Sequence, residues 1–146
     1  MLSWLLLASC TSYWFKLNKN RPLRIGSGSL QSYRIHLAGS FKHDVKKLER
    51  RFRHIKNDIH TAINLLTKDP RVGVVIPGSS GMRKLRIPNQ DQRRGKSGGY
   101  RLIYYVREQP IPTIYLLRLY SKSYQKDLTT YEVKQLLGEL TDMLTE

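Results

Sequence analysis

The chain has 146 residues, a length that suits one domain with a single hydrophobic core and argues against two independent domains. It carries 26 Lys and Arg against 11 Asp and Glu, and a net charge of +15 favours a phosphate-rich partner such as nucleic acid. No segment approaches the roughly 20 consecutive apolar residues of a membrane-spanning helix, so we expect no membrane partner. The single cysteine, Cys10, excludes an internal disulfide and is compatible with a cytoplasmic location.

Residues 1–31 do not share the patterns of the remaining chain. The apolar run from Trp4 to Ala8 is shorter than a signal-peptide core, and Gly26-Ser27-Gly28-Ser29 is typical of a flexible join. A translation start placed too far upstream would produce such a segment. We therefore expect a poorly defined N-terminal extension over 1–31 and a folded domain over 32–146.

The first part of this domain reads as a strand followed by a helical region. Polar and apolar residues alternate over 33–37, which predicts a strand with one buried face. Ser40 stands where a helix N-cap is expected, and apolar residues then recur at three- and four-residue steps as far as Leu66. Asp69-Pro70 ends the helical region. Periodicity alone permits one long helix, and a helical hairpin that bends near 55–57 is the competing interpretation.

Three strands and a helix are predicted beyond a Gly/Ser-rich loop. The strands cover 82–87, 100–107 and 113–120, and the last two are rich in aromatic and β-branched residues. Thr129 and Glu132 have the spacing of a capping box, which predicts that a helix starts there. The order of strand, helical region, three strands and helix indicates an α+β fold.

The predicted strand pair over 82–107 is unusually basic. Asp91 is the only acid between positions 83 and 101, whereas seven residues there are cationic. These cations are Arg83, Lys84, Arg86, Arg93, Arg94, Lys96 and Arg101. Because alternate residues of a strand share a face, paired strands gather such side chains on one surface. The pattern predicts a binding site for a polyanion.

The residues do not indicate the commoner catalytic systems. We find no nucleophile elbow, no phosphate-cradling loop and no Cys/His grouping with zinc-ligand spacing, so we expect neither a metal nor another cofactor. Basic strands suit the cleavage of RNA, because RNA supplies its own nucleophile, the 2′-hydroxyl. Arginine clamps the phosphate, and a lysine crowded by other cations can exchange protons. Tyr100, Tyr120 and Tyr124 are candidates for stacking on unpaired bases.

Three runs of residues carry a family resemblance. They are Lys84-Leu85-Arg86, Lys96-Ser97-Gly98-Gly99-Tyr100-Arg101-Leu102-Ile103-Tyr104-Tyr105 and Ile114-Tyr115-Leu116-Leu117-Arg118-Leu119-Tyr120-Ser121-Lys122-Ser123. Together they resemble the RelE/HigB toxins of bacterial type II toxin–antitoxin systems, over roughly 33–140. The resemblance implies a RelE-like fold, which is a small, twisted, mainly antiparallel sheet with an N-terminal helical hairpin and a C-terminal helix. It therefore favours two helices across 40–69.

The same resemblance implies a function. Such toxins are metal-independent endoribonucleases that enter the ribosomal A site, cleave mRNA there and inhibit translation until a cognate antitoxin restrains them. By position, Lys84 and Arg86 match residues that contact phosphate and assist proton transfer, and Arg101 matches the arginine that binds the scissile phosphate. Lys122 lies where the family often has Arg or Lys after its fourth strand.

Further residues follow from the resemblance and the basic pattern together. We expect the substrate to be bound by Arg83, Lys96, Tyr100, Tyr120 and Tyr124. The C-terminal catalytic tyrosine of some RelE members has no clear counterpart, because Leu128 is nearest to its place. The identity of the general base stays open, with Lys84 as the favoured acid/base candidate.

Three alternatives remain at this level. Gly98-Gly99 is either a simple turn or a point where small residues let the RNA backbone approach. The chain is either a ribonuclease or a non-catalytic ParE-like toxin that acts on DNA gyrase, which would not need the set of Lys84, Arg86 and Arg101. The unusual extension over 1–31 also raises an inactive relative as an option.

Overall fold

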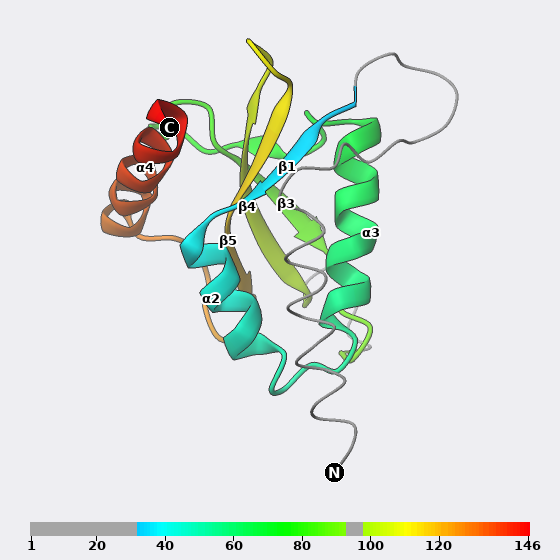
Figure 1. Cartoon of the computed structure of the whole chain (residues 1–146). Helices are drawn as coiled ribbons and strands as arrows, with labels where there is room; N and C mark the ends of the chain where they lie inside the picture. Colours follow the sequence, from blue (N-terminus) through cyan, green and yellow to red (C-terminus); the bar gives the residue numbers. More distant parts are fainter. Residues whose placement is uncertain (1–31, 93–97) are drawn as a thin grey trace.

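A computed structural model describes residues 32–92 and 98–146, which form five strands and three helices (Figure 1). The elements follow one another as β1 Arg34–Leu37, α2 Gly39–Leu48, α3 Ile55–Lys68, β2 Val74–Val75, β3 Arg83–Ile87, β4 Tyr100–Arg107, β5 Thr113–Ser121 and α4 Thr130–Thr145. The expected extension over 1–31 lies outside the described residues.

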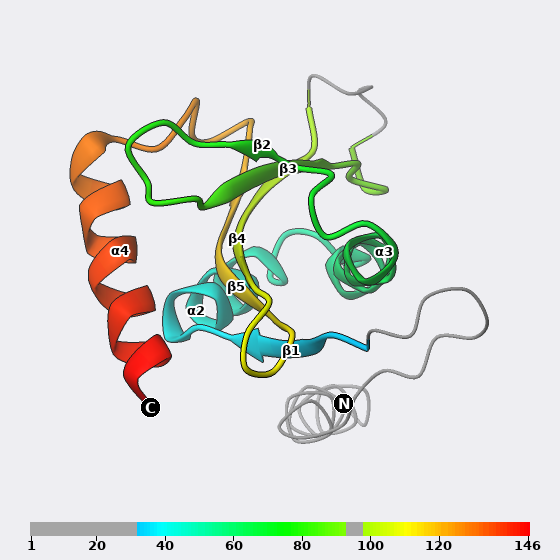
Figure 2. The same ribbon diagram turned by 90° about the horizontal axis from the view of Figure 1, so that it is seen from above.

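The strands form one sheet in the order β1-β5-β4-β3-β2. Strand β1 runs parallel to β5, and the other neighbours are antiparallel. The predicted α+β fold with a mainly antiparallel sheet, an N-terminal helical hairpin and a C-terminal helix is therefore confirmed. Figures 1 and 2 show α3 and α4 on opposite sides of this sheet. Strand β2 was not predicted, because two exposed valines carry no readable alternation.

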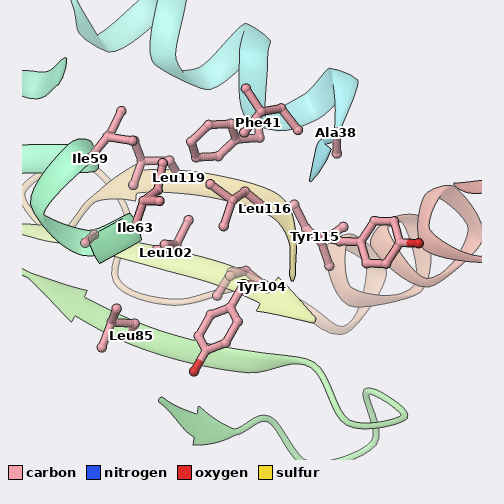
Figure 3. Close-up of a cluster of buried hydrophobic side chains, with 14 of the residues drawn as sticks. Ala38, Phe41, Ile59, Ile63, Leu85, Leu102, Tyr104, Tyr115, Leu116 and Leu119 are labelled. Carbon is pink, nitrogen blue, oxygen red and sulfur yellow. The ribbon is translucent and has the colours of Figure 1, made fainter. Parts of the chain in front are cut away.

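The core lies between the helical hairpin and the central strands. Phe41 of α2 and the pair Ile59 and Ile63 of α3 are at most 2% exposed. They pack toward Leu102 of β4 and Leu116 of β5, which are equally buried (Figure 3). Burying large apolar side chains gives roughly 1.5–3 kcal/mol each. This layer covers one face of β4 and β5, and α4 packs against part of the other face through Leu136 and Leu140.

The helical region is a hairpin, but its bend lies at residues 49–54, earlier than the predicted 55–57. The backbone N–H groups of Arg51 and Phe52 both donate to the Leu48 carbonyl at 3.0 Å, so the turn keeps a nearly helical spacing. Phe52 is buried in this turn, and Ile55 is buried at the start of α3. The apolar stripe consequently continues through the turn, and periodicity could not locate the bend.

The start of α2 also differs from expectation. Helix α2 begins at Gly39 after Ala38, and no side chain caps it. Ser40 instead donates its hydroxyl to one oxygen of Glu139 at 2.5 Å and its N–H to the other at 3.1 Å. Ser40 is thus a contact between α2 and α4, and its predicted capping role is wrong.

The predicted capping box at the start of α4 is confirmed. The Thr129 hydroxyl oxygen accepts from the Glu132 N–H at 3.2 Å, and the Glu132 carboxylate accepts from the Thr129 N–H at 2.8 Å. That second hydrogen bond is the main reason why the pKa of Glu132 is lowered. The resulting stabilisation is present above the ordinary pKa of a glutamate and is lost as the pH falls through the lowered pKa.

Thr129→Ala should lower the free energy of unfolding by about 1 kcal/mol at neutral pH, because the N-terminal N–H groups of α4 lose an acceptor. Urea denaturation would measure this loss. Thr141→Ala removes an exposed hydroxyl within the same helix, where it donates to the Leu137 carbonyl, and should cost nothing. Equal losses in the two variants would contradict a specific capping role.

Candidate functional site

Three cations of the predicted set share one face of the sheet. Lys84 and Arg86 are two residues apart on β3, and Arg86 lies directly opposite Arg101 of β4. Arg101 in turn lies opposite Tyr120 of β5. We call Lys84, Arg86 and Arg101 the basic face. The register of β3 and β4 brings these three side chains onto one face, as expected for paired strands.

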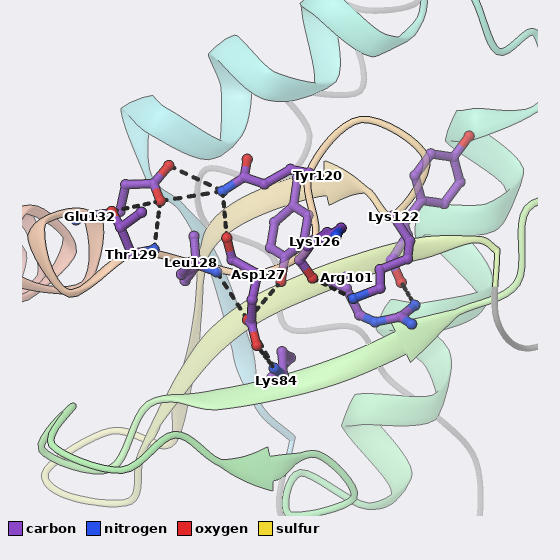
Figure 4. A network of polar contacts seen from close by, with 11 residues as sticks. Lys84, Arg101, Tyr120, Lys122, Lys126, Asp127, Leu128, Thr129 and Glu132 are labelled. Atoms are coloured by element: carbon purple, nitrogen blue, oxygen red, sulfur yellow. Dashed lines mark hydrogen bonds and ion pairs between the residues drawn. The ribbon is translucent and has the colours of Figure 1, made fainter.

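Lys122 joins this region from the end of β5. Its backbone N–H donates to the carbonyl of Gly99 at 3.0 Å, which ties the chain after β5 to the start of β4. The Lys122 ammonium donates to the carbonyl of Lys126 in the connection between β5 and α4. Figure 4 shows Lys122 and Lys126 together with Arg101 and Lys84. The strand end therefore places a fourth cation near the basic face.

Arg101 is a buried cation that forms no ion pair with an acid among residues 32–92 and 98–146. It is 5% exposed, and its guanidinium donates to the carbonyls of Gly98 and Tyr100, both at 3.2 Å. No carboxylate of the described residues lies within ion-pair distance of it. Burial lowers the pKa of Arg101, and the neighbouring Arg86 lowers it further. Asp127 offsets part of this effect from beyond ion-pair distance, and a buried charge with only a distant counter-charge favours a bound anion.

Lys84 has an acidic partner that the sequence did not reveal. Its ammonium donates to both carboxylate oxygens of Asp127, at 3.0 and 3.1 Å, and the Tyr120 hydroxyl donates to the first oxygen at 3.3 Å. The Leu128 N–H also donates to that oxygen, at 2.9 Å. The Lys84 hydrogen bond is the main cause of the lowered pKa of Asp127 (Figure 4). Burial and the Asp127 charge raise the pKa of Tyr120 to about 12.

Two predicted stacking residues are core residues. Tyr100 is fully buried with its ring edge-on to Phe52, at 5.6 Å between centroids, and burial raises the pKa of its hydroxyl. Tyr120 is 5% exposed. Since a buried ring has no free face, neither side chain can stack on a base in this structure, although the Tyr120 hydroxyl reaches the site. Tyr124 is 54% exposed, and the Arg51 guanidinium lies 4.9 Å from its ring centroid, so Tyr124 stays a candidate for stacking.

Arg83 does not belong to the basic face. It precedes Lys84 on β3 and therefore points to the opposite side of the sheet. Its guanidinium donates to the carbonyls of Gly73 at 2.7 Å and Arg71 at 3.2 Å, which holds the segment before β2 against β3. Its expected contact with substrate is replaced by this structural role. Lys96 lies outside the described residues.

The described part of the chain has neither a metal-binding cluster nor a membrane-spanning helix. There, no group of three or more His, Cys, Asp or Glu side chains is arranged to hold a metal ion. Over the same residues, every helix is too short or too polar to cross a membrane.

Fold and site together define an α+β domain with a basic face on its sheet. No family model matches the chain. Among solved structures, the chain is similar to the E. coli toxin RelE, in a double arginine-to-alanine mutant in the free state. The two chains are 12% identical with a TM-score of 0.46, and the match covers 76% of this chain and 96% of that one.

Proposed function

We propose that this protein is a toxin of the RelE/HigB type, a metal-independent endoribonuclease that cleaves mRNA on the ribosome. The observation that carries the proposal is the basic face, where Arg101 is buried without an acidic partner beside Arg86 and Lys84. The sequence resemblance over roughly 33–140 supports it, because the same three residues match catalytic positions of that family. A protein that only docks on another protein would not need this set.

The basic face suits the chemistry of RNA cleavage. The RNA 2′-hydroxyl gives up its proton to a solvent water and attacks the adjacent phosphorus, and the bond from phosphorus to the 5′-oxygen breaks, leaving a 2′,3′-cyclic phosphate and a 5′-hydroxyl. Arg101 and Arg86 would hold the non-bridging oxygens and stabilise the charge that builds up on them. Lys84 would deliver a proton to the leaving 5′-oxygen, and Lys122 would add positive charge beside the phosphate.

The proposal includes partners. In the cell, the protein would act in the cytoplasm, reach mRNA in the ribosomal A site, and be neutralised by a cognate antitoxin. The net charge of +15 supports both associations, since ribosomal RNA and an acidic protein are attracted by the same field.

Lys84→Ala should reduce mRNA cleavage by about 10²-fold, because one proton-transfer group is lost. Primer extension on a translated mRNA would measure the cleavage rate. The matched control is Lys68→Ala, which removes an exposed lysine at the end of α3, away from the basic face. It should cleave like the unmodified protein, whereas unchanged cleavage by Lys84→Ala would contradict the assigned role.

Pulse-labelling after induction separates the ribonuclease from a toxin acting on DNA gyrase. The proposal requires protein synthesis to fall first. An earlier fall in DNA synthesis would replace it by a ParE-like function, and the absence of any growth arrest would indicate an inactive relative.

A further inference from the structure

We infer that the Asp127 carboxylate occupies a phosphate-binding position on the basic face, and that an RNA phosphodiester entering the site exchanges with it. This inference deepens the proposed function and rests on it, since RNA is the ligand. Two side-chain donors from different strands converge on the carboxylate, namely the Lys84 ammonium and the Tyr120 hydroxyl. The same donors could bind the non-bridging oxygens of a phosphate, which are also anionic acceptors.

The donors lie on strands of the sheet, whereas the acid lies in an exposed connection, where the Leu128 N–H also donates to it at 2.9 Å. Lys84 and Tyr120 belong to β3 and β5, and their side chains are 32% exposed and buried, respectively. Asp127 lies in the connection between β5 and α4, and its side chain is 62% exposed. An ion pair as open as this contributes only about 0–1 kcal/mol, so the carboxylate can turn to solvent without disturbing the sheet. The position would then be free for a ligand.

Two neighbouring phosphate positions follow from the strand register. Lys84 lies opposite Ile103, which is two residues along β4 from Arg101. Lys84 and Arg101 are therefore diagonal neighbours on one face, a relation that separates residues by about 7–8 Å in antiparallel sheets. The Arg101 position has no acid, whereas Asp127 fills the Lys84 position. A ligand with consecutive phosphates can bind Arg101 with one phosphate while the next phosphate displaces Asp127 from Lys84. A single anion cannot bind both positions in this way.

Asp127→Asn tests this exchange, because it removes the charge and keeps the shape of the side chain. The probe is a fluorescent oligoribonucleotide with 2′-O-methyl groups throughout, which cannot be cleaved, and anisotropy titrations at several salt concentrations give its Kd. We expect roughly three- to tenfold tighter binding than for the unmodified protein, since the RNA no longer competes with the Asp127 carboxylate for Lys84 and Tyr120. The salt dependence should stay close to that of the unmodified protein, because the same phosphates contact the protein in both bound states.

Asp142→Asn is the matched control, because it removes the same charge from an exposed residue of α4. It should leave both Kd and the salt dependence nearly unchanged. A second comparison uses Tyr120→Phe, which keeps the buried ring. Added to Asp127→Asn, it should remove part of the gain in affinity, because the phosphate loses a hydroxyl donor. In a protein that retains Asp127, Tyr120→Phe should change Kd less, because the Tyr120 hydroxyl donates to the Asp127 carboxylate there.

The outcomes separate the inference from the proposed function. If the unmodified protein binds the oligonucleotide and Asp127→Asn binds it no more tightly than Asp142→Asn, the exchange does not occur. Weaker binding by Asp127→Asn would also overturn it, by showing that the carboxylate orders Lys84 for the ligand. An unmodified protein that binds no RNA would overturn the proposed function and this inference together.

Discussion

Arg101→Ala should reduce RNA cleavage by roughly 10²–10³-fold and abolish growth arrest on expression. The magnitude is typical of removing a preorganised donor that faces the charge developing in a transition state. Arg101 has that character because its burial removes water from around the guanidinium. Its guanidinium donates to two backbone carbonyls, at Gly98 and Tyr100, which fix its orientation without forming an ion pair.

A loss of cleavage in this variant needs a folding control, because Arg101 is buried. Arg101→Lys keeps a long cationic side chain but loses the planar fork, so it should fold normally and still cleave at least tenfold more slowly. Arg50→Ala removes an exposed arginine from the turn between α2 and α3 and should keep full activity. Thermal unfolding would establish that the variants are folded. Cleavage at the normal rate by folded Arg101→Ala would exclude the basic face as the site of the reaction.

The parts of the site that could be predicted are those set by strand periodicity. A two-residue repeat places Lys84 and Arg86 on one face of β3, and a hairpin of β3 with β4 brings Arg101 alongside. The same repeat shows that Arg83 points the other way, yet it cannot say which face is covered by helices. That depends on how α2 and α3 pack, and only the structure shows that the Arg83 guanidinium donates to the Gly73 and Arg71 carbonyls.

Two further features of the site also depend on tertiary packing. Tyr100 and Tyr120 are aromatic residues beside cations, a composition that fits both a stacking surface and a core. Only the tertiary packing, with Phe52 of the α2–α3 turn against Tyr100, decides between them. Asp127 is 43 residues from Lys84 in the sequence, and nothing in its local pattern indicates the pairing. Asp127 lies in the connection between β5 and α4, and its pairing with a residue of β3 can be found only when the sheet register is known.

Gly98-Gly99, which precedes β4, can be interpreted from the sequence either as a simple turn or as a point where the RNA backbone approaches. The backbone conformation of Gly99 gives the turn a physical basis. Gly99 has a φ of +68°, a region that other residues rarely adopt, and a Cβ there would lie 2.4 Å from the Ile87 carbonyl oxygen. Its own carbonyl accepts the Lys122 N–H. The residue is therefore required for the close approach of β3, β4 and the chain after β5, two residues before Arg101.

Gly99→Ala should lower the free energy of unfolding by about 2–5 kcal/mol, as the sum of left-handed backbone strain and a clash with backbone atoms that cannot move away. Two other glycines separate these causes. Gly78 has a φ of +70° but open space around its Cβ position, so Gly78→Ala should cost only about 1–2 kcal/mol. Gly138 lies in α4 with nothing within 4 Å, and Gly138→Ala should stabilise the protein by roughly 0.5–1 kcal/mol. Urea denaturation of the three variants would measure the series. If Gly99→Ala cost no more than Gly78→Ala, the contact with Ile87 would not constrain the chain. The close approach of β3 and β4 at Gly99 would then not explain how Arg101 is positioned.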